Sequence, residues 1–257
     1  MITTVKITFL GTGTSSGIPQ IGCSCEVCTS SDPRDNRLRC SIFVETENLK
    51  LLVDMGPDLR QQFLRENIKT LDAILVTHPH RDHIGGLDEI RSLNFILQKP
   101  IDIYCNEFSE EGIRELHAYV FRKTNYPYLP KVNFKRISNA PFSIGDLAIT
   151  PAEVMHAEMP VLGFRMGNFA YVTDCKTIAP SEKEKLKNLD VLVLNALRDQ
   201  EHHSHLTFAQ AIELATELNP KKVYFIHISH HAGTHETRQA TLPKNFFIAY
   251  DGLTLEV

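Results

Sequence analysis

The sequence lacks three features that would each define a class of protein. None of its apolar runs is long enough to cross a bilayer, so we expect no membrane-spanning helix. Its formal net charge of −4 provides no basic field that would attract long nucleic acids or a membrane surface. The first six residues, Met1 to Lys6, lack the charged and apolar regions of a signal peptide. We therefore expect a cytoplasmic protein.

Cysteines are also few, and three of the six fall close together. In a reducing compartment such cysteines are more often metal ligands, catalytic groups or buried thiols than disulfides. Cys23, Cys25 and Cys28 lie in a polar loop, where three thiolates suit a tetrahedral ion with a fourth ligand from elsewhere. Zinc is the default ion for soft thiolates. The alternative is a set of free surface cysteines.

One short segment carries four side chains that can bind a metal ion. It follows an apolar run at 73–76, which predicts a buried strand, and it precedes Gly85-Gly86, which interrupts regular structure. The loop between a strand and a helix lets side chains converge on one point. Three imidazoles and one carboxylate suit zinc, manganese or iron in a hydrolytic site. These residues are His78, His80, Asp82 and His83.

Apolar periodicity predicts the regular elements around this segment. Helices are expected at 57–66, 87–97, 107–121 and 207–218. Asp251-Gly252 predicts a hairpin between the last two strands. The strands are expected at 5–10, 41–45, 50–53, 73–76, 101–105, 142–144, 147–150, 161–166, 169–172, 191–194, 222–226, 246–250 and 253–257.

Several isolated residues are weak candidates when taken alone. His156 is expected in a loop between two strands, while Asp174 and His227 each follow the end of a strand. The glycine-rich loop at 11–17 predicts either a tight turn or a cradle for phosphate made of backbone N–H groups. An aromatic loop at 126–130 either forms a wall of the substrate pocket or contacts a partner.

The segment His78-x-His80-x-Asp82-His83 after an apolar strand resembles the signature of the metallo-β-lactamase superfamily of dinuclear metallohydrolases. The resemblance implies an α/β fold, a four-layer αββα sandwich over residues 1–257. It would form one domain of two half-domains, with an inserted zinc-binding loop near 22–36. It also implies that a loop histidine, a strand-end aspartate and a last strand-end histidine complete the site, roles that fall to His156, Asp174 and His227.

The resemblance further implies how two divalent ions, Mn²⁺ or Zn²⁺, are shared among these residues. Asp174 and a hydroxide would bridge the ions, and the hydroxide would attack the substrate. Asp82 is therefore counted as catalytic as well as a ligand. Asp54 is expected either to orient a ligand imidazole or simply to end its strand. One ion would be held by His78, His80 and His156, and the other by Asp82, His83 and His227.

A second motif, His205-x-Thr207, resembles the His-x-Thr of phosphodiesterases in this superfamily, whose histidine protonates the leaving group. His203 would take that role if the register were shifted by two residues. Together with the cysteine loop, the motif resembles PhnP-type phosphodiesterases, which implies small phosphodiesters, such as cyclic ribosyl or nucleotide phosphates, as substrates, and a homodimer. A thioester hydrolase and a tRNase Z-like ribonuclease are the alternatives, although no long inserted arm is evident.

The fourth ligand of the cysteine site is expected near the end of the chain. His230 lies three residues after His227, and the pair resembles the His-x-x-His of PhnP-type chains. The neighbouring His231 is the alternative. The sequence therefore predicts one structural Zn²⁺ in addition to the two ions of the active site.

Overall fold

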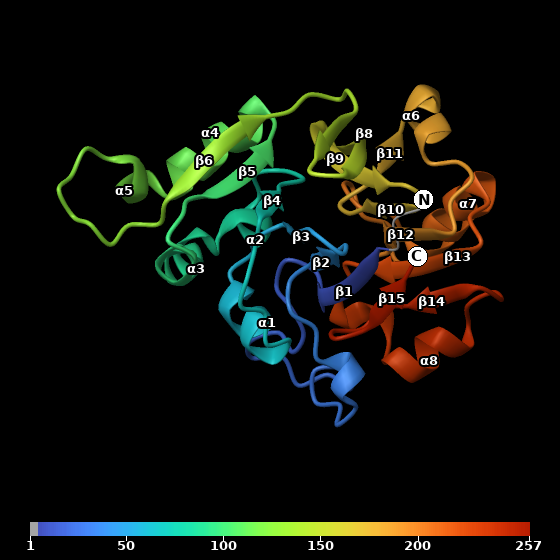
Figure 1. Cartoon of the computed structure of the whole chain (residues 1–257). Coiled ribbons are helices and arrows are strands. Elements are labelled where there is room, and N and C mark those ends of the chain that lie inside the picture. The colour runs from blue at the N-terminus through green and yellow to red at the C-terminus, as the bar shows by residue number, and fades with distance from the viewer. Residues whose placement is uncertain (1–4) are drawn as a thin grey trace.

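Two mixed β-sheets face each other in the computed structural model, which describes residues 5–257 (Figure 1). The first sheet contains β1 (Lys6–Gly11), β2 (Ser41–Glu45), β3 (Lys50–Val53), β4 (Ala73–Leu75), β5 (Ile101–Cys105), β6 (Val132–Arg136) and β15 (Thr254–Glu256). Its order is β15-β1-β2-β3-β4-β5-β6. Strands β3 to β6 run parallel, whereas β1 pairs antiparallel with β2 and β15.

The second sheet begins with antiparallel strands and ends with parallel ones. It contains β7 (Phe142–Ile144), β8 (Leu147–His156), β9 (Met159–Met166), β10 (Phe169–Val172), β11 (Thr177–Ile178), β12 (Val191–Asn195), β13 (Lys222–Ile226) and β14 (Phe246–Ile248). Its order is β11-β8-β9-β10-β12-β13-β14, and β7 pairs with β8. From β10 to β14 neighbouring strands are parallel, so their carboxyl ends meet at one edge.

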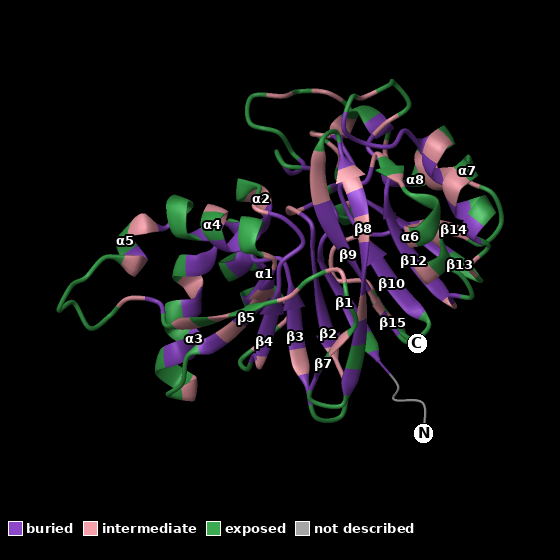
Figure 2. Ribbon diagram, turned by 90° about the horizontal axis from the view of Figure 1, so that it is seen from above, coloured by how far each residue is buried: buried purple, intermediate pink, exposed green. Residues whose placement is uncertain are grey.

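Helices connect the strands and cover the outer faces of both sheets (Figures 1 and 2). The α-helices are α1 (Leu59–Arg65), α2 (Arg81–Ile84), α3 (Ile90–Leu97), α4 (Glu107–Leu116), α5 (Ala118–Phe121), α6 (Pro180–Lys185), α7 (Phe208–Leu218) and α8 (His235–Ala240). Three short 3-10 helices are η1 (Pro33–Asp35), η2 (Leu87–Glu89) and η3 (His230–Ala232). No helix among residues 5–257 is both long and apolar enough to cross a membrane.

Three separate apolar clusters account for the four layers. The central cluster joins the inner faces of the two sheets, for example Phe9 from β1 and Phe164 from β9. A second cluster lies between the first sheet and its helices, and includes Phe63 of α1. The third lies between the second sheet and α7, which contributes Phe208. Because each cluster removes one face of a sheet from water, the arrangement is an αββα sandwich.

The prediction of a hairpin at Asp251-Gly252 is wrong. The two flanking strands belong to different sheets, because β14 pairs with β13 and β15 pairs with β1. The side chain of Asp251 is 7% exposed and accepts hydrogen bonds at 2.8 Å from the Thr12 hydroxyl and from the Leu38 N–H. These contacts hold a turn that carries the chain from one sheet to the other.

Two further expectations need correction. His156 does not lie in a loop but is the last residue of β8, which is longer than predicted. The single helix expected at 107–121 is interrupted at His117, which divides it into α4 and α5. The imidazole of His117 is buried, and its Nε2 donates to the Ile84 carbonyl at 2.9 Å. The contact of this side chain with the end of α2 thus takes the place of a continuous helix at His117.

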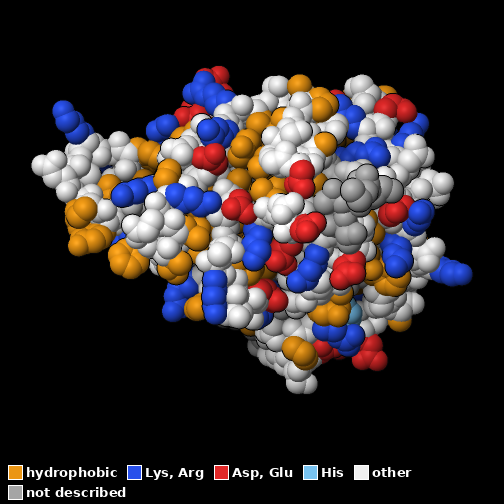
Figure 3. All heavy atoms as spheres, in the orientation of Figure 1, with side chains coloured by type: hydrophobic (Ala, Val, Ile, Leu, Met, Phe, Trp, Pro, Cys, Tyr) orange, Lys and Arg blue, Asp and Glu red, His pale blue; other side chains and the backbone are white. Residues whose placement is uncertain are grey.

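The aromatic loop after α5 extends to one end of the molecule (Figure 1). Tyr126 and Tyr128 are exposed and line a cavity of about 490 Å³ with Phe95 and Ile96 of α3. Hydrophobic side chains gather visibly over this end of the surface (Figure 3). None of the predicted metal ligands lines this cavity, so here the loop does not form a wall of the metal site.

Candidate metal centre

The loop after β4 brings His78 and His80 together with Asp174, which follows β10 in the other sheet. His78 Nε2 lies 3.1 Å from His80 Nδ1 and 3.7 Å from Asp174 Oδ2. Ligands on one tetrahedral ion, with bonds of about 2.0–2.2 Å, are about 3.3–3.6 Å apart. The three side chains therefore have the spacing of a shared coordination sphere.

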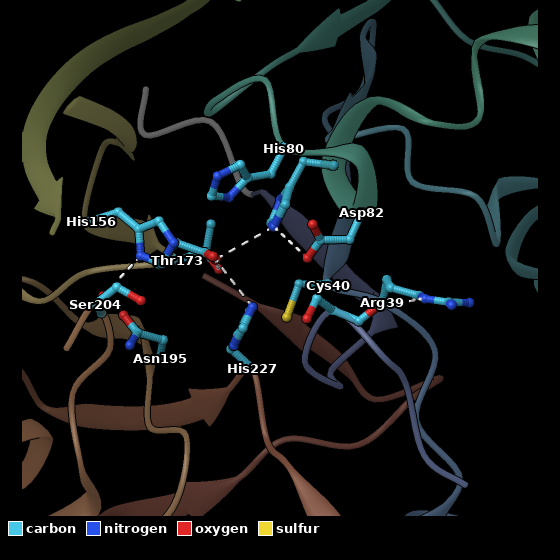
Figure 4. Close-up of polar contacts among 12 residues, drawn as sticks. Arg39, Cys40, His80, Asp82, His156, Thr173, Asn195, Ser204 and His227 are labelled. Carbon is cyan, nitrogen blue, oxygen red and sulfur yellow. Dashed lines mark hydrogen bonds and ion pairs between the residues drawn. The ribbon is translucent and has the colours of Figure 1, made fainter. Parts of the chain in front are cut away.

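A second cluster adjoins the first and consists of Asp82, His83 and His227. His83 Nε2 lies 3.3 Å from Asp82 Oδ2 and 3.4 Å from Asp174 Oδ1. His227 Nε2 lies 3.4 Å from the other oxygen of Asp174. Asp174 thus touches residues of both clusters, as a bridging carboxylate would. Figure 4 shows His80 and Asp82, from the segment after β4, converging with His156 and His227 from the second sheet.

Unpartnered nitrogen atoms show that this donor set fits metal ions. His83 Nε2 and both ring nitrogens of His227 are buried, and none has a hydrogen-bond partner among residues 5–257. A buried polar atom without a partner is costly, and native proteins rarely leave one unexplained. A cation between the clusters would provide the missing partner for His83 Nε2 and for one ring nitrogen of His227.

Electrostatics within the clusters favours charged carboxylates. Burial opposes ionisation of Asp174, but His227 and then His83 outweigh it and place the pKa of this carboxyl well below its ordinary value. Burial likewise opposes a charge on His83, yet the carboxylates of Asp82 and Asp174 raise its pKa well above the ordinary value. The carboxylates therefore attract a proton onto His83 as they would attract a cation.

Three residues of the site turn the chain with unusual backbone angles. Asp54, Asp174 and His227 each follow a strand and have φ values of 63°, 53° and 59°. The left-handed region is uncommon for residues with a side chain, although Asp and His tolerate it better than most. Such conformations persist at functional sites because the surrounding structure enforces them. Here they place the side chains at the carboxyl ends of the strands.

Asp54 orients His83, in agreement with one of its two predicted roles. Its Oδ2 accepts from His83 Nδ1 at 2.7 Å and from the Thr77 hydroxyl at 2.8 Å, while Oδ1 accepts from the Thr77 N–H at 2.9 Å. The carboxylate is completely buried. These bonds fix the ring so that its Nε2 faces the clusters.

We expect Asp54→Asn to weaken metal binding by about 10–100-fold, the usual effect of losing a partner behind a ligand histidine. The amide keeps the shape of the side chain but not the charge that fixes the His83 tautomer. Titration against a chelating dye measures the affinity. Asp102→Asn on β5 is the control, since Asp102 contacts Asn133 and lies outside both clusters. Equal affinity in the two variants would contradict this role.

His156 and His205 complete the site on the side of the second sheet. Both form a group with Asp174 whose ligand atoms lie within 4.8 Å of one another. His156 Nδ1 donates to the Ser204 carbonyl at 2.8 Å, which fixes the ring at the end of β8. The His205 ring centroid lies 4.5 Å from those of His156 and His227. The geometry permits His205 to be either a ligand or a neighbour of the ligands.

The neighbour of His205 is His202, which the sequence analysis did not single out. Their ring centroids are 5.0 Å apart, whereas the ring of the exposed His203 is tilted against His202, with a centroid distance of 4.5 Å. Thr207 caps α7 and forms a capping box with Gln210. His205 is buried beside the clusters, whereas His203 is exposed. Which of the two donates a proton stays a prediction.

The three loop cysteines surround the imidazole of His230. Their sulfur atoms lie 3.3, 3.4 and 3.6 Å from His230 Nδ1, in the order Cys23, Cys25, Cys28. Sulfur and nitrogen ligands of one tetrahedral zinc are about 3.5 Å apart. His231 is exposed and does not belong to the group. The geometry therefore groups His230, and not His231, with the three thiols.

The thiols of this cluster cannot all ionise without a cation. Hydrogen bonds from the Cys28 backbone and His230 lower the pKa of Cys25 to about 6. Burial, followed by the neighbouring thiols, raises the pKa of Cys28 to about 11. A metal ion would provide the positive charge that stabilises three thiolates together. The cluster therefore fits a structural metal.

The glycine-rich loop at 11–17 is a turn and not a phosphate cradle. The Gly13 N–H donates to the Leu38 carbonyl at 2.8 Å, and the Thr14 N–H donates to the Ile228 carbonyl at 3.0 Å. A Cβ at Gly11 would lie 1.9 Å from the Arg39 carbonyl oxygen. The glycine therefore permits close contact between backbone segments, and the N–H groups of Gly13 and Thr14 already donate within the chain.

Residues 50–228 match the family model of the Beta-lactamase superfamily domain. The chain belongs to this superfamily. The expected metallo-β-lactamase fold is thereby confirmed, together with its two mixed sheets. The chain combines this fold with histidine and aspartate clusters that could hold metal ions.

Two curated proteins illustrate the range of relatives. An octanoyltransferase of Porphyromonas gingivalis is 39% identical over 252 residues, which is 97% of this chain and 51% of that protein. Coenzyme PQQ synthesis protein B of Methylobacterium radiotolerans is 31% identical over 101 residues, or 34% of either protein. The chain thus spans about half the length of the first relative. Its match to the second relative covers about a third of that protein.

Solved structures resemble the whole chain. A diphosphatase from the PhnP family superposes with a TM-score of 0.92 at 39% identity, covering 98% of both chains. Zn²⁺-bound PqqB from Methylobacterium extorquens gives 0.75 at 19% identity, covering 98% of this chain and all of that one. The short form of human tRNase Z gives 0.72 at 18%, covering 97% and 98%. The last two are evidence for the fold alone.

Proposed function

We propose that the chain hydrolyses phosphodiester or diphosphate bonds of small molecules. The observation that carries the proposal is the likeness over nearly the full length to a PhnP-family diphosphatase, in a chain whose own clusters fit two metal ions. Divalent cations bound there, Mn²⁺ or Zn²⁺, would acidify a water and neutralise phosphate oxygens. The chain itself orients the ligands and supplies His205.

We assign to His205 the role of assisting the leaving oxygen. Burial, followed by the neighbouring His227, lowers the pKa of His205 to about 2, so the ring is neutral before substrate binds. An anionic phosphate beside the ring favours its protonated form. We therefore assign its protonation to the enzyme–substrate complex, in which the ring donates a proton to the departing oxygen.

The two alternatives have less support. A thioester hydrolase would use the same clusters, but a thiolate leaves without a proton donor, so His205 would have no evident purpose. A tRNase Z-like ribonuclease requires an extended surface for RNA, and the net charge of −4 does not provide one. The likeness to human tRNase Z is at the level of the fold.

Elemental analysis combined with three substrates tests the proposal. We expect about three metal ions per chain, of which the cysteine-bound ion resists mild chelation. Turnover of a phosphodiester or a diphosphate should disappear on chelation and return with Mn²⁺ or Zn²⁺. Two ions per chain, with turnover of a thioester only, would contradict both the phosphohydrolase assignment and the zinc site.

A further inference from the structure

The pairing between β10 and β12 stops just before the metal site. Its last partners are Val172 and Leu194, and the chain then turns at Asp174, whose φ is 53°. A buried backbone that leaves a sheet needs new partners for its N–H and C=O groups. Cys175, which follows the turn, is completely buried. The partners of its N–H and C=O groups therefore show what holds Asp174 in place.

The side chain of Asn195 supplies both kinds of partner. The Cys175 N–H donates to Asn195 Oδ1 at 2.7 Å, and Asn195 Nδ2 donates to the Cys175 carbonyl at 3.0 Å. Asn195 is the last residue of β12 and is itself completely buried. A carboxamide carries a donor and an acceptor on separate atoms, as a peptide group does. The side chain thus continues the pairing of β12 beyond the point where the backbone of β10 turns away.

The Cys175 carbonyl also joins Asp174 to the segment that contains His205. The Leu206 N–H donates to this carbonyl at 3.1 Å, so the oxygen accepts from two groups. Leu206 follows His205 directly, as Cys175 follows Asp174. Asp174 and His205 form a group with His156 whose ligand atoms lie within 4.8 Å of one another. The peptide groups around Cys175 are therefore common support for two members of this group.

We propose that Asn195 is a positioning residue that holds the carboxylate of Asp174 and the imidazole of His205 in place relative to each other. It acts through the backbone of Cys175. Figure 4 shows Asn195 on the same side of the site as His156 and Ser204. The part of this inference that concerns His205 rests on the proposed function. The part that concerns Asp174 requires only that the clusters bind metal ions.

Removing the amide would leave the buried Cys175 N–H without its partner. Such a group is costly, so the local backbone rotates until it finds another partner. Because Asp174 is the preceding residue and has a left-handed backbone, this rotation displaces a carboxylate that contacts both clusters. Losing a supporting partner behind a metal ligand usually weakens metal binding by about 10–100-fold.

Asn94 offers a matched control, because its amide forms the same pair of hydrogen bonds elsewhere. The Lys131 N–H donates to Asn94 Oδ1 at 2.8 Å, and Asn94 Nδ2 donates to the Lys131 carbonyl at 2.9 Å. Asn94 lies on α3 and is also buried. Neither residue belongs to a group of candidate ligands. Asn94→Ala therefore removes a comparable pair of bonds without a contact to the site.

The test measures Mn²⁺ binding after the active-site ions have been removed, and follows the free ion by electron paramagnetic resonance. Asn195→Ala should bind Mn²⁺ about 10–100-fold more weakly than the wild type, whereas Asn94→Ala should stay within about twofold. Asn195→Ser can keep one of the two bonds through its hydroxyl, so its affinity should be intermediate. This variant carries the test if Asn195→Ala does not fold. Unchanged affinity in both Asn195 variants, or an equal loss in Asn94→Ala, would overturn the inference.

Turnover at saturating Mn²⁺ separates the effect on His205 from the effect on metal binding. Asn195→Ala should lower kcat for a phosphodiester with an alkyl leaving group about tenfold more than kcat for bis(p-nitrophenyl) phosphate, because only the alkoxide needs a proton. An equal loss on both substrates would reject the link to His205. If the wild type cleaves neither substrate, the proposed function fails, while the Mn²⁺ titration still decides whether Asn195 positions Asp174.

Discussion

His205→Ala is expected to reduce turnover of a phosphodiester with an alkyl leaving group by about 10²–10⁴-fold, the usual contribution of a placed proton donor. The loss should be much smaller with p-nitrophenolate, which leaves without a proton. Metal content should not change, because the two proposed ligand sets are complete without His205. Steady-state kinetics on both substrates, with elemental analysis of the same samples, measures all three expectations.

The matched control is His203→Ala, which removes an exposed imidazole from the same segment. It should retain nearly full turnover of both of these substrates. The competing interpretation is that His205 is itself a ligand, since it forms a group with His156 and Asp174. Loss of one metal ion per chain in His205→Ala would favour that interpretation and reject the role of proton donor.

The second large effect is expected from His230→Ala, which removes the fourth ligand of the cysteine cluster. If free zinc exceeds its dissociation constant by about 1,000-fold, binding stabilises the folded chain by about 4 kcal/mol. Losing this contribution corresponds to about 8–16 °C in Tm for a chain of this size. The loop depends on the ion because few of its side chains are buried; Val27 is one of them.

Thermal unfolding and zinc content measure the result, and His231→Ala is a close control. This neighbouring imidazole is exposed and lies outside the cluster, so its variant should keep the zinc and the wild-type Tm. The reverse pattern, with zinc lost only from His231→Ala, would show that the ligand is the other histidine. Unchanged zinc content in both variants would reject the four-residue site.

Much of the fold could be predicted because long apolar patterns determine it. Strands β2, β3, β5, β10 and β13 have the predicted bounds, since each is a buried run with clear turn residues beside it. The short elements β6, β11, α6 and α8 were not predicted, because two to six residues carry too little periodicity. The hairpin at Asp251-Gly252 failed for a different reason. A local turn signal does not specify which sheet each flanking strand joins.

The candidate site was predictable where residues are close in sequence. His78 to His83 form a recognisable cluster, whereas His156, Asp174 and His227 needed the family resemblance to stand out. The choice between His230 and His231 required distances, because adjacent residues share the same sequence context. The catalytic roles stay predictions.

The pairing of β1 with β15 sets a lower limit on the time the chain needs to fold during synthesis. Lys6 lies opposite Glu256, so this edge of the first sheet closes only after residue 256 has been made. At about 5–20 residues per second, the ribosome needs about 12–50 s to make the residues between them. Until then β1 has one edge without its final neighbour, and a nascent chain with an open strand edge is prone to pair with other molecules.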